Sequence, residues 1–260
     1  MMITKPIKPM IKRPGGKTRL LKHLMPLIEA RPHVCYVEVF AGGAAVLGAK
    51  AKSEVEVIND ADQDLANCYR QIQHHEEEVI KWLPRINSRQ LFKEWKTASG
   101  LTDIQRAARY LYVNALSFGA DGQSWGVKKQ SAGGGAVTSL DNLRVTVKNF
   151  TARLDRVNVE NLDWSRCIDL YDGLNTLFFC DPPYTTGGQK SYSCFTKEQA
   201  DALASKMRSI QGQMILTIDD TDDNRARFRG LIVQRLTTSA SIAANSKRFG
   251  EFIAATPLRK

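Results

Sequence analysis

The sequence predicts an α/β protein with a mostly parallel sheet. The runs Val34–Phe40, Val55–Ile58 and Thr176–Cys180 are short and largely apolar, as in strands that are buried on both faces. Between these runs, apolar residues recur at helical spacing. Strands that alternate with helices favour a sheet covered by helices on both faces. A length of 260 residues suffices for one large domain or for a core with an inserted module.

The composition and net charge indicate which kinds of partner the protein can bind. A net charge of +10 and a pI near 9.4 suit a protein that meets phosphate, although solvated lysine and arginine faces give the same charge. No run is long enough to span a membrane and no secretory signal is present, which predicts a cytoplasmic protein without membrane contact. Five scattered cysteines and four histidines, none in a ligand pattern, predict neither disulfides nor a metal site.

The first expected element is a loop from Lys12 to Thr18 that runs into a helix carrying leucines from Leu20 to Leu27. The free N–H groups at a helix N-terminus attract an anion, and Lys17 adds a full positive charge. The spacing of the glycines and the lack of a preceding strand argue against a nucleoside triphosphate site.

A glycine turn follows the first predicted strand. Ala41-Gly42-Gly43 leads into a small-residue helix at Ala44–Lys50, and the next strand ends at Asn59-Asp60. Glycines let the backbone approach a ligand, and an acid at the end of the next strand is placed to accept hydrogen bonds from ribose hydroxyls. Because the G-x-G-x-x-G pattern is absent, the turn favours S-adenosylmethionine over a dinucleotide.

The middle of the chain predicts an insertion into the α/β core. Helical spacing runs from Ala61 to Leu83, and a capping box of Thr102 with Gln105 starts a further helix. The glycine-rich stretch Ala120–Leu140 is expected to be either a disordered loop or a hairpin that orders on DNA. Two or three βα units of about thirty residues each leave a surplus here. We therefore expect a core of residues 1–66 and 152–260 and an inserted module of residues 67–151.

The α/β pattern then resumes. A capping box of Thr196 with Gln199 starts a helix that ends before Gly212. Ser239–Arg248 is expected to be a polar loop. Strands are predicted at Val157–Trp164, Thr176–Cys180, Gln213–Ile218, Leu231–Leu236 and Glu251–Thr256.

Asp181-Pro182-Pro183-Tyr184 is the segment on which the functional prediction depends. It follows a buried strand, at the carboxyl edge where open α/β sheets bind ligands. The two prolines fix two φ angles and bias Asp181 away from the α region, which holds the carboxylate and the Tyr184 ring in one relation. The segment is expected to clamp something flat, although an isolated four-residue match also fits a simple strand end.

Together these motifs resemble the Dam-type, or D12 class, DNA adenine-N6 methyltransferases. The resemblance implies a Rossmann-like methyltransferase sheet, S-adenosylmethionine as methyl donor and an adenine flipped out of the DNA. It also implies that Asp181 and the Pro182 carbonyl bind the adenine amino group while Tyr184 stacks on the base. Arg13 departs from the pattern, since members usually have Trp or Tyr there. The matching segments are Lys12–Lys17, Glu38–Gly43, Asn59-Asp60, Asn114–Gly119 and Asp181–Tyr184.

The expected site residues fall into three groups. The catalytic group is Asp181, Pro182 and Tyr184. The cofactor group is Arg13, Lys17, Phe40, Gly42, Asp60, Asp163 and Asp181. The DNA group is Arg109, Asn114, Ser117, Trp125, Lys128, Lys129 and Arg144. The expected partner is double-stranded DNA, bound by a protein that is monomeric in solution.

Other interpretations stay open. One is a nucleic-acid-binding homologue with weak or no catalysis, and another is an amino methyltransferase acting on cytosine, RNA adenine or a protein amide. A nicotinamide oxidoreductase is a distant third, because its glycine fingerprint is missing. Restriction-modification, replication marking and phage self-protection are equally compatible with these residues.

Overall fold

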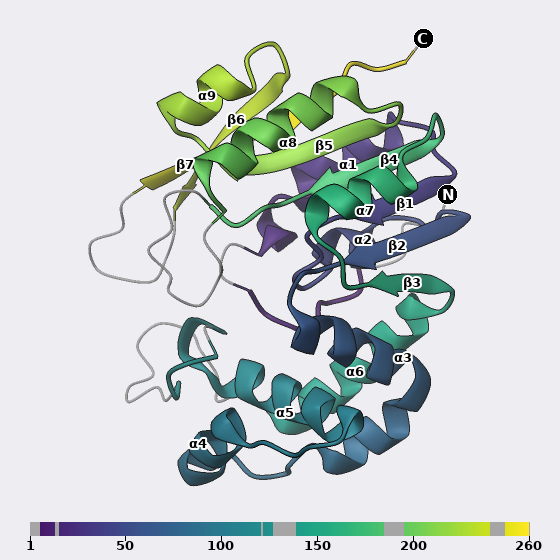
Figure 1. Ribbon diagram of the computed structural model, residues 1–260. Helices are drawn as coiled ribbons and strands as arrows, with labels where there is room; N and C mark the ends of the chain where they lie inside the picture. Colours follow the sequence, from purple (N-terminus) through teal and green to yellow (C-terminus); the bar gives the residue numbers. More distant parts are fainter. Residues whose placement is uncertain are drawn as a thin grey trace. The chain divides into compact units, whose positions relative to one another are not determined.

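The computed structural model describes residues 6–13, 16–120, 122–126, 139–184, 195–239 and 248–259 (Figure 1). The chain divides into two compact units. The first comprises residues 1–21, 42–51 and 60–161, and the second comprises residues 22–41, 52–59 and 162–260. The division groups the N-terminal loop and the Gly42 turn with the helices. The predicted insertion at residues 67–151 concerns chain topology and stays a prediction.

A mixed sheet forms the second unit, which confirms the predicted α/β class. Within this unit the strands follow the order β2-β1-β4-β5-β7-β6. Neighbours from β2 to β5 are parallel, whereas β7 runs antiparallel to both β5 and β6. Every residue of β4 and of β5 is buried, which explains their apolar sequences. The strands are β1 (Cys35–Glu38), β2 (Val55–Asn59), β4 (Thr176–Cys180), β5 (Gln213–Asp219), β6 (Ile232–Ser239) and β7 (Arg248–Ala255).

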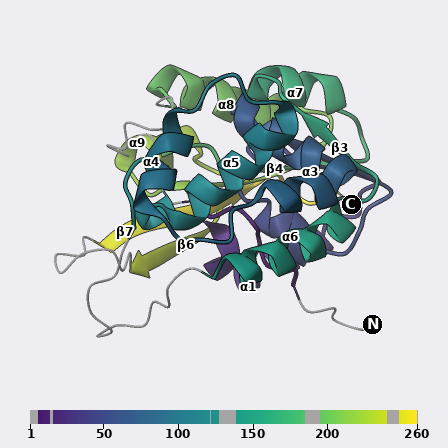
Figure 2. The same ribbon diagram turned by 90° about the horizontal axis from the view of Figure 1, so that it is seen from below.

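Helices cover both faces of this sheet. α7 (Trp164–Tyr171) and α8 (Lys197–Ser209) lie on one face and α1 (Leu21–Glu29) on the other (Figures 1 and 2). Ile168 of α7 and Leu203 of α8 share one buried cluster with Phe178 of β4. Burying these faces supplies the main driving force for folding. The short helix α9 (Asp222–Arg227) follows β5.

The first unit is mostly helical. α5 (Asp103–Leu116) packs against α3 (Gln63–Trp82) and α4 (Arg89–Thr97), and α6 (Leu140–Leu154) packs against α3. α3 departs from helical geometry at His75, where φ is −135° and ψ is 40°. The remaining elements are η1 (Lys17–Arg19), α2 (Ala45–Ala49), η2 (Phe118–Ala120) and β3 (Val157–Glu160).

Both predicted capping boxes are confirmed. Thr102 accepts a hydrogen bond from the N–H of Gln105, and the Gln105 side chain accepts one from the N–H of Thr102. Thr196 and Gln199 form the same reciprocal pair at the start of α8. Each box satisfies two N–H groups that a helix start would otherwise leave unpaired.

Some element boundaries were wrong. The predicted strand Val157–Trp164 ends at Glu160, because the Asp163 side chain accepts from the N–H of Ser165 and caps α7. Lys17 begins a three-residue 3₁₀ turn, and the α-helix starts only at Leu21. The helices α4, α6, α7 and α9 were not predicted. Of the two expected loops, residues 127–138 and 240–247 lie outside the described residues.

None of the helices in the described part of the chain combines the length and the apolar character that a membrane span requires.

Candidate active site

The clamp begins where β4 ends. Cys180 is the last residue of β4 and pairs with Leu216 of β5, so Asp181 comes level with Thr217 on the neighbouring strand. The Thr217 hydroxyl donates a hydrogen bond of 2.8 Å to Oδ1 of Asp181. Thr217 is fully buried, so this bond cannot be exchanged readily for one to water. The strand register therefore fixes one oxygen of the predicted catalytic carboxylate.

The other end of the clamp is held by a different strand. The hydroxyl of Tyr184 donates to Oε1 of Glu251 on β7, which is 5% exposed. Glu251 pairs with Asp219 at the end of β5. Pro182 is buried, whereas Asp181 and Tyr184 are half-buried. The aromatic ring is thus anchored at its hydroxyl end while part of its surface stays accessible.

Three aromatic rings gather beside the end of β1. Phe40 stacks on Trp164 with a centroid distance of 6.4 Å and an interplanar angle of 27°. Phe195 meets Phe40 edge-on at 5.8 Å and lies 6.1 Å from Trp164. Phe40 remains half-buried although its two partners are buried. The cluster presents a partly accessible ring from a position that was predicted to contact the cofactor.

Asn59 joins the strand ends in the second unit. Its side-chain amide donates to the carbonyl oxygens of Val39 and Leu162, and its Oδ1 accepts from the N–H of Leu162. Asn59 is 1% exposed, so these bonds satisfy a buried amide and hold the segment before α7. The asparagine of the predicted Asn-Asp motif therefore has an architectural role.

In the first unit, Asp60 closes the glycine turn. Its Oδ2 accepts from the N–H of Gly42 at 2.9 Å, and its Oδ1 accepts from the N–H of Asp62 at 3.0 Å. Burial raises the pKa of the Asp60 carboxyl, while these two N–H groups and the charge of Arg13 oppose the rise. Gly42 has φ of +49°, a conformation that favours glycine. Gly42 and Asp60, both predicted in the cofactor group, are thus joined by a hydrogen bond.

Arg13 lies in a closed triangle of polar groups. Its Nη2 donates to Oδ2 of Asp62 at 2.8 Å and to the hydroxyl of Tyr110 at 2.5 Å. The Tyr110 hydroxyl donates to the same Asp62 oxygen at 3.0 Å. The Arg13 Cζ atom also lies 5.9 Å from the centre of the Tyr110 ring. The residue that departs from the family pattern is therefore held by two neighbours that the sequence did not single out.

Comparison with known proteins decides the family. Residues 14–245 match the family described as D12 class N6 adenine-specific DNA methyltransferase. The chain belongs to this family. The predicted membership of the D12 class is therefore confirmed, and the family is described as acting on adenine in DNA.

Individual relatives are also methyltransferases. This chain is 31% identical over 121 residues to Type II methyltransferase M1.LlaDCHI of Lactococcus lactis subsp. cremoris, over 43% of this chain and 42% of that protein. It thus matches less than half the length of that relative. It is 23% identical over 218 residues to Type II methyltransferase M.MjaIII of Methanocaldococcus jannaschii, over 74% of each chain. Among solved structures, rRNA methyltransferase aviRa of Streptomyces viridochromogenes matches 97% of this chain and 88% of that one, with a TM-score of 0.40 and 13% identity.

Two other residues of the predicted cofactor group, Lys17 and Asp163, have defined positions in the structure. Lys17 is 5% exposed at the start of η1, which places its charged side chain inside the first unit. Asp163 caps α7, as described above, with its Oδ1 atom. Their contact with a cofactor stays a prediction.

The end of α5 is held in place by contacts of three residues of the predicted DNA group, Asn114, Ser117 and Trp125. The Asn114 amide exchanges two hydrogen bonds of 2.9 Å with the backbone of Lys12. The Ser117 hydroxyl donates to the carbonyl of Asn114, and the backbone of Ser117 forms an isolated bridge with Trp125. The Trp125 ring meets Phe92 edge-on at 5.4 Å.

The described bonds of two predicted DNA-contacting arginines stay within the first unit. Arg109 donates to Oδ2 of Asp64 and to the carbonyl of Ala98. Arg144 is 8% exposed and donates to the carbonyls of Leu83 and Pro84, just after α3 ends. These bonds hold helix ends in place. Lys128 and Lys129 lie outside the described residues.

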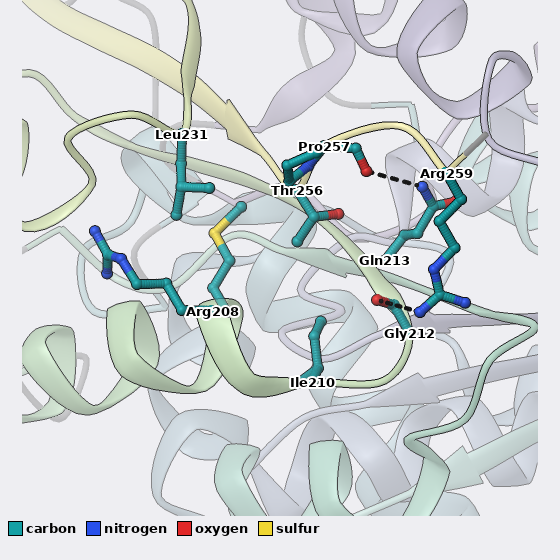
Figure 3. A pocket seen from close by; sticks show the side chains of 9 residues that line it. Arg208, Ile210, Gly212, Gln213, Leu231, Thr256, Pro257 and Arg259 are labelled. Carbon is teal, nitrogen blue, oxygen red and sulfur yellow. Dashed lines mark hydrogen bonds between the residues drawn. The ribbon is translucent and has the colours of Figure 1, made fainter.

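A pocket of about 360 Å³ opens at the opposite edge of the sheet from the clamp. Gln213 at the start of β5 and Thr256 just after β7 line it (Figure 3). Its two arginines donate hydrogen bonds to backbone carbonyl oxygens. Arg208 donates to those of Ala204 and Arg227, and Arg259 donates to those of Leu174 and Gly212. Because β4 and β5 begin here, the pocket is remote from Asp181 along both strands, and we assign it no catalytic role.

The sequence did not reveal several residues that position the site. Thr217 and Glu251 lie within predicted strands, and only the register of those strands brings them to the clamp. Asp62 could have been predicted as a helix N-cap, because an acid just before a helical segment is a common N-cap. No pattern in the sequence indicated Tyr110, since tyrosines on amphipathic helices usually pack into the core.

Proposed function

We propose that this chain transfers the methyl group of S-adenosylmethionine to the N6 amino group of adenine in double-stranded DNA. The observation that carries the proposal is the clamp, with Asp181 bonded to Thr217 and Tyr184 bonded to Glu251. Both groups are held by neighbouring strands before any ligand arrives. Preorganised polar groups of this kind contribute most when they need not move during the reaction.

The residues of the glycine turn fit the proposed cofactor. Asp60 is a partly buried carboxylate, and carboxylates accept hydrogen bonds from ribose hydroxyls. Phe40 offers a partly accessible ring for an adenine to stack on. Lys17 would contribute positive charge near the cofactor carboxylate. When bound, the sulfonium cofactor supplies an electrophilic methyl group.

Asp181 would then act on the adenine amine. The lone pair of that nitrogen is delocalised into the ring, so the free amine is a weak nucleophile. A carboxylate has about four acceptor sites, and its bond to Thr217 leaves capacity for an amino N–H. Asp181 and the Pro182 carbonyl would each accept one N–H bond, which favours a more pyramidal nitrogen facing the methyl group. Holding the reactants in line can supply roughly 7–11 kcal/mol of the barrier reduction.

Tyr184 would receive the base. Flipping an adenine from a duplex costs a few kcal/mol. Stacking on an aromatic side chain returns about 1–3 kcal/mol. The bond between Tyr184 and Glu251 limits the rotation of the ring, so that less entropy is lost when a base stacks on it.

The proposed DNA contacts lie in residues 67–151. Asn114, Ser117 and Trp125 would present the end of α5, and Lys128 and Lys129 would meet phosphates. Arg109 and Arg144 would act by positioning helices, because their described bonds go to the carboxylates of Asp64 and Asp141 and to backbone carbonyls. We further propose a cytoplasmic monomer. A type II role like that named for its two relatives is one candidate setting.

A labelling experiment tests the proposal. The protein is incubated with S-adenosylmethionine carrying a labelled methyl group and with duplex DNA of varied sequence, single-stranded DNA or RNA. Digestion to nucleosides and mass spectrometry then locate the label. We expect N6-methyladenine from the duplex and none with Asp181→Asn.

The alternatives give distinct results. Label in N4-methylcytosine or in RNA would assign the enzyme another substrate. Calorimetric binding of the cofactor without any product would identify a catalytically inactive homologue. Absence of both cofactor binding and product would refute the proposal.

A further inference from the structure

We propose that Arg13 is a positioning residue that holds the Asp60 carboxylate in place at the glycine turn, acting through Asp62 and Tyr110 rather than by touching the reactants. The proposal rests on the cofactor role proposed above for Asp60. It assigns a new function to the residue that departs from the family pattern, and to two residues, Asp62 and Tyr110, that carry no assignment.

The first step is the continuous chain of hydrogen bonds. Arg13 and Tyr110 both donate to Oδ2 of Asp62, the N–H of Asp62 donates to Asp60, and Asp60 accepts from Gly42. The other oxygen of Asp62 accepts from the N–H groups of Asp64 and Leu65 and so caps α3. Asp62 thus links the start of a long helix to the Asp60 carboxylate.

The second step is contact across the glycine turn. A Cβ atom placed on Gly42 would lie 3.6 Å from Cγ of Arg13, so the arginine stem passes directly over the turn. The Arg13 side chain is 17% exposed and the Asp62 side chain 36%. This ion pair is therefore only partly screened by solvent, and it acts at short range on the turn.

The third step is the balance of charge around the Asp60 carboxyl. Asp60 and Asp62 are two acids separated by one residue, and the charge of Asp62 raises the pKa of Asp60 while that of Arg13 lowers it. Three further titratable groups surround them from the described elements: Tyr110 of α5, and Cys68 and Asp64 of α3. Burial raises the pKa of both Tyr110 and Cys68, so neither gains charge at neutral pH. Asp64 is paired with Arg106 and Arg109, whereas Arg13 pairs with Asp62 and is the positive charge that lowers the pKa of Asp60.

The fourth step is the consequence for binding. Asp60 accepts hydrogen bonds from ribose hydroxyls more strongly when it is ionised than when it is protonated, so affinity falls as pH drops through its pKa. Without Arg13 that pKa rises, and the loss of affinity begins at higher pH. Without the charge of Asp62 the pKa falls, and the loss begins at lower pH. A residue that merely supports the fold would weaken binding by the same factor at every pH.

The test is calorimetric titration of S-adenosylmethionine into the whole 260-residue chain between about pH 3.5 and 8.5. We expect Arg13→Gln to move the acidic midpoint of affinity upward and Asp62→Asn to move it downward. The double variant should return close to the wild-type midpoint. Asparagine is also a good N-cap, so α3 should keep its start. Protonation of the cofactor itself is common to all variants and cancels in the comparison.

Two controls separate charge from shape. Tyr110→Phe removes a hydroxyl but no charge, so it should weaken binding by about threefold to tenfold at all pH values without moving the midpoint. Arg89→Gln removes the same charge as Arg13→Gln from an exposed position on α4 and should change nothing.

Each outcome has one meaning. If the wild-type protein does not bind the cofactor, the proposed function fails. If it binds but Arg13→Gln and Asp62→Asn share the wild-type midpoint, or shift it in the same direction, the positioning role of Arg13 is wrong. Thermal unfolding of each variant shows that the protein measured is folded.

Discussion

The buried hydroxyl of Thr217 donates a 2.8 Å hydrogen bond to Oδ1 of Asp181. The two residues are 36 positions apart in the chain: Asp181 directly follows β4, and Thr217 lies in the neighbouring parallel strand β5. A hydrogen bond to a charged group is worth about 1.5–3 kcal/mol, enough to hold a carboxylate in one orientation. The catalytic proposal depends on this bond, and the first predictions concern it.

Asp181→Ala and Asp181→Asn should both lose methyl transfer. We expect at least about a hundredfold fall in kcat, the scale seen when one preorganised hydrogen-bonding group is removed from a reacting centre. Single-turnover labelling of DNA measures it. DNA affinity, measured by fluorescence anisotropy, should stay within about twofold. Full activity in either variant would contradict the assignment of Asp181.

Thr217→Val replaces the hydroxyl by a methyl group of similar volume. Since Asp181 then loses a buried partner, we expect kcat to fall roughly tenfold, which corresponds to about 1.4 kcal/mol. Thr217→Ser keeps the hydroxyl and should retain most of the activity. If the valine and serine variants have equal kcat, the hydrogen bond does not contribute to catalysis.

Substitutions at Tyr184 separate stacking from anchoring. Tyr184→Ala should cost about 1–3 kcal/mol of base binding, or roughly fivefold to 150-fold. Tyr184→Phe keeps the ring but loses the bond to Glu251, so its loss should be much smaller. The fluorescence of 2-aminopurine at the target position reports base flipping directly. Equal effects of the two variants would show that the hydroxyl, and not the ring, is what matters.

Arg144 and the lysine pair should differ in their effects. Arg144→Met leaves the buried carbonyls of Leu83 and Pro84 without donors and should lower the free energy of unfolding by about 1–3 kcal/mol. Lys128→Ala with Lys129→Ala should leave stability unchanged but reduce the salt dependence of DNA binding by about one unit per lost phosphate contact. Denaturant unfolding and binding at several salt concentrations measure both. An unchanged salt slope in the lysine double variant would remove these residues from the DNA surface.

Two cysteines should be unreactive in the folded protein. Burial raises the pKa of the thiols of Cys68 and Cys180, both of which are fully buried. The thiolate is the reactive form, so at pH 8 alkylation should be slow at both positions and become fast after unfolding in denaturant. Mass spectrometry of modified peptides follows each cysteine. Rapid alkylation of Cys180 in the native state would show that the end of β4 opens readily.

The sequence determined the parts of this protein that depend on local chemistry. The largely apolar run Thr176–Cys180 specified the bounds of β4 correctly, because such a composition at this length suits a strand buried on both faces. The Thr102 and Thr196 capping boxes specified two helix starts, since their hydrogen bonds join residues three apart. Five short segments in the right order also sufficed to indicate the family.

Tertiary structure alone decided which distant residues meet. That Thr217 faces Asp181, and that Glu251 reaches Tyr184, follows from the register of β4, β5 and β7. The antiparallel insertion of β7 between β5 and β6 has no local signature. Arg13 stood out in the sequence only as a departure. Its partnership with Asp62 and Tyr110, 49 and 97 residues away, could not be predicted, because hydrogen bonds between distant residues leave no pattern in a single sequence.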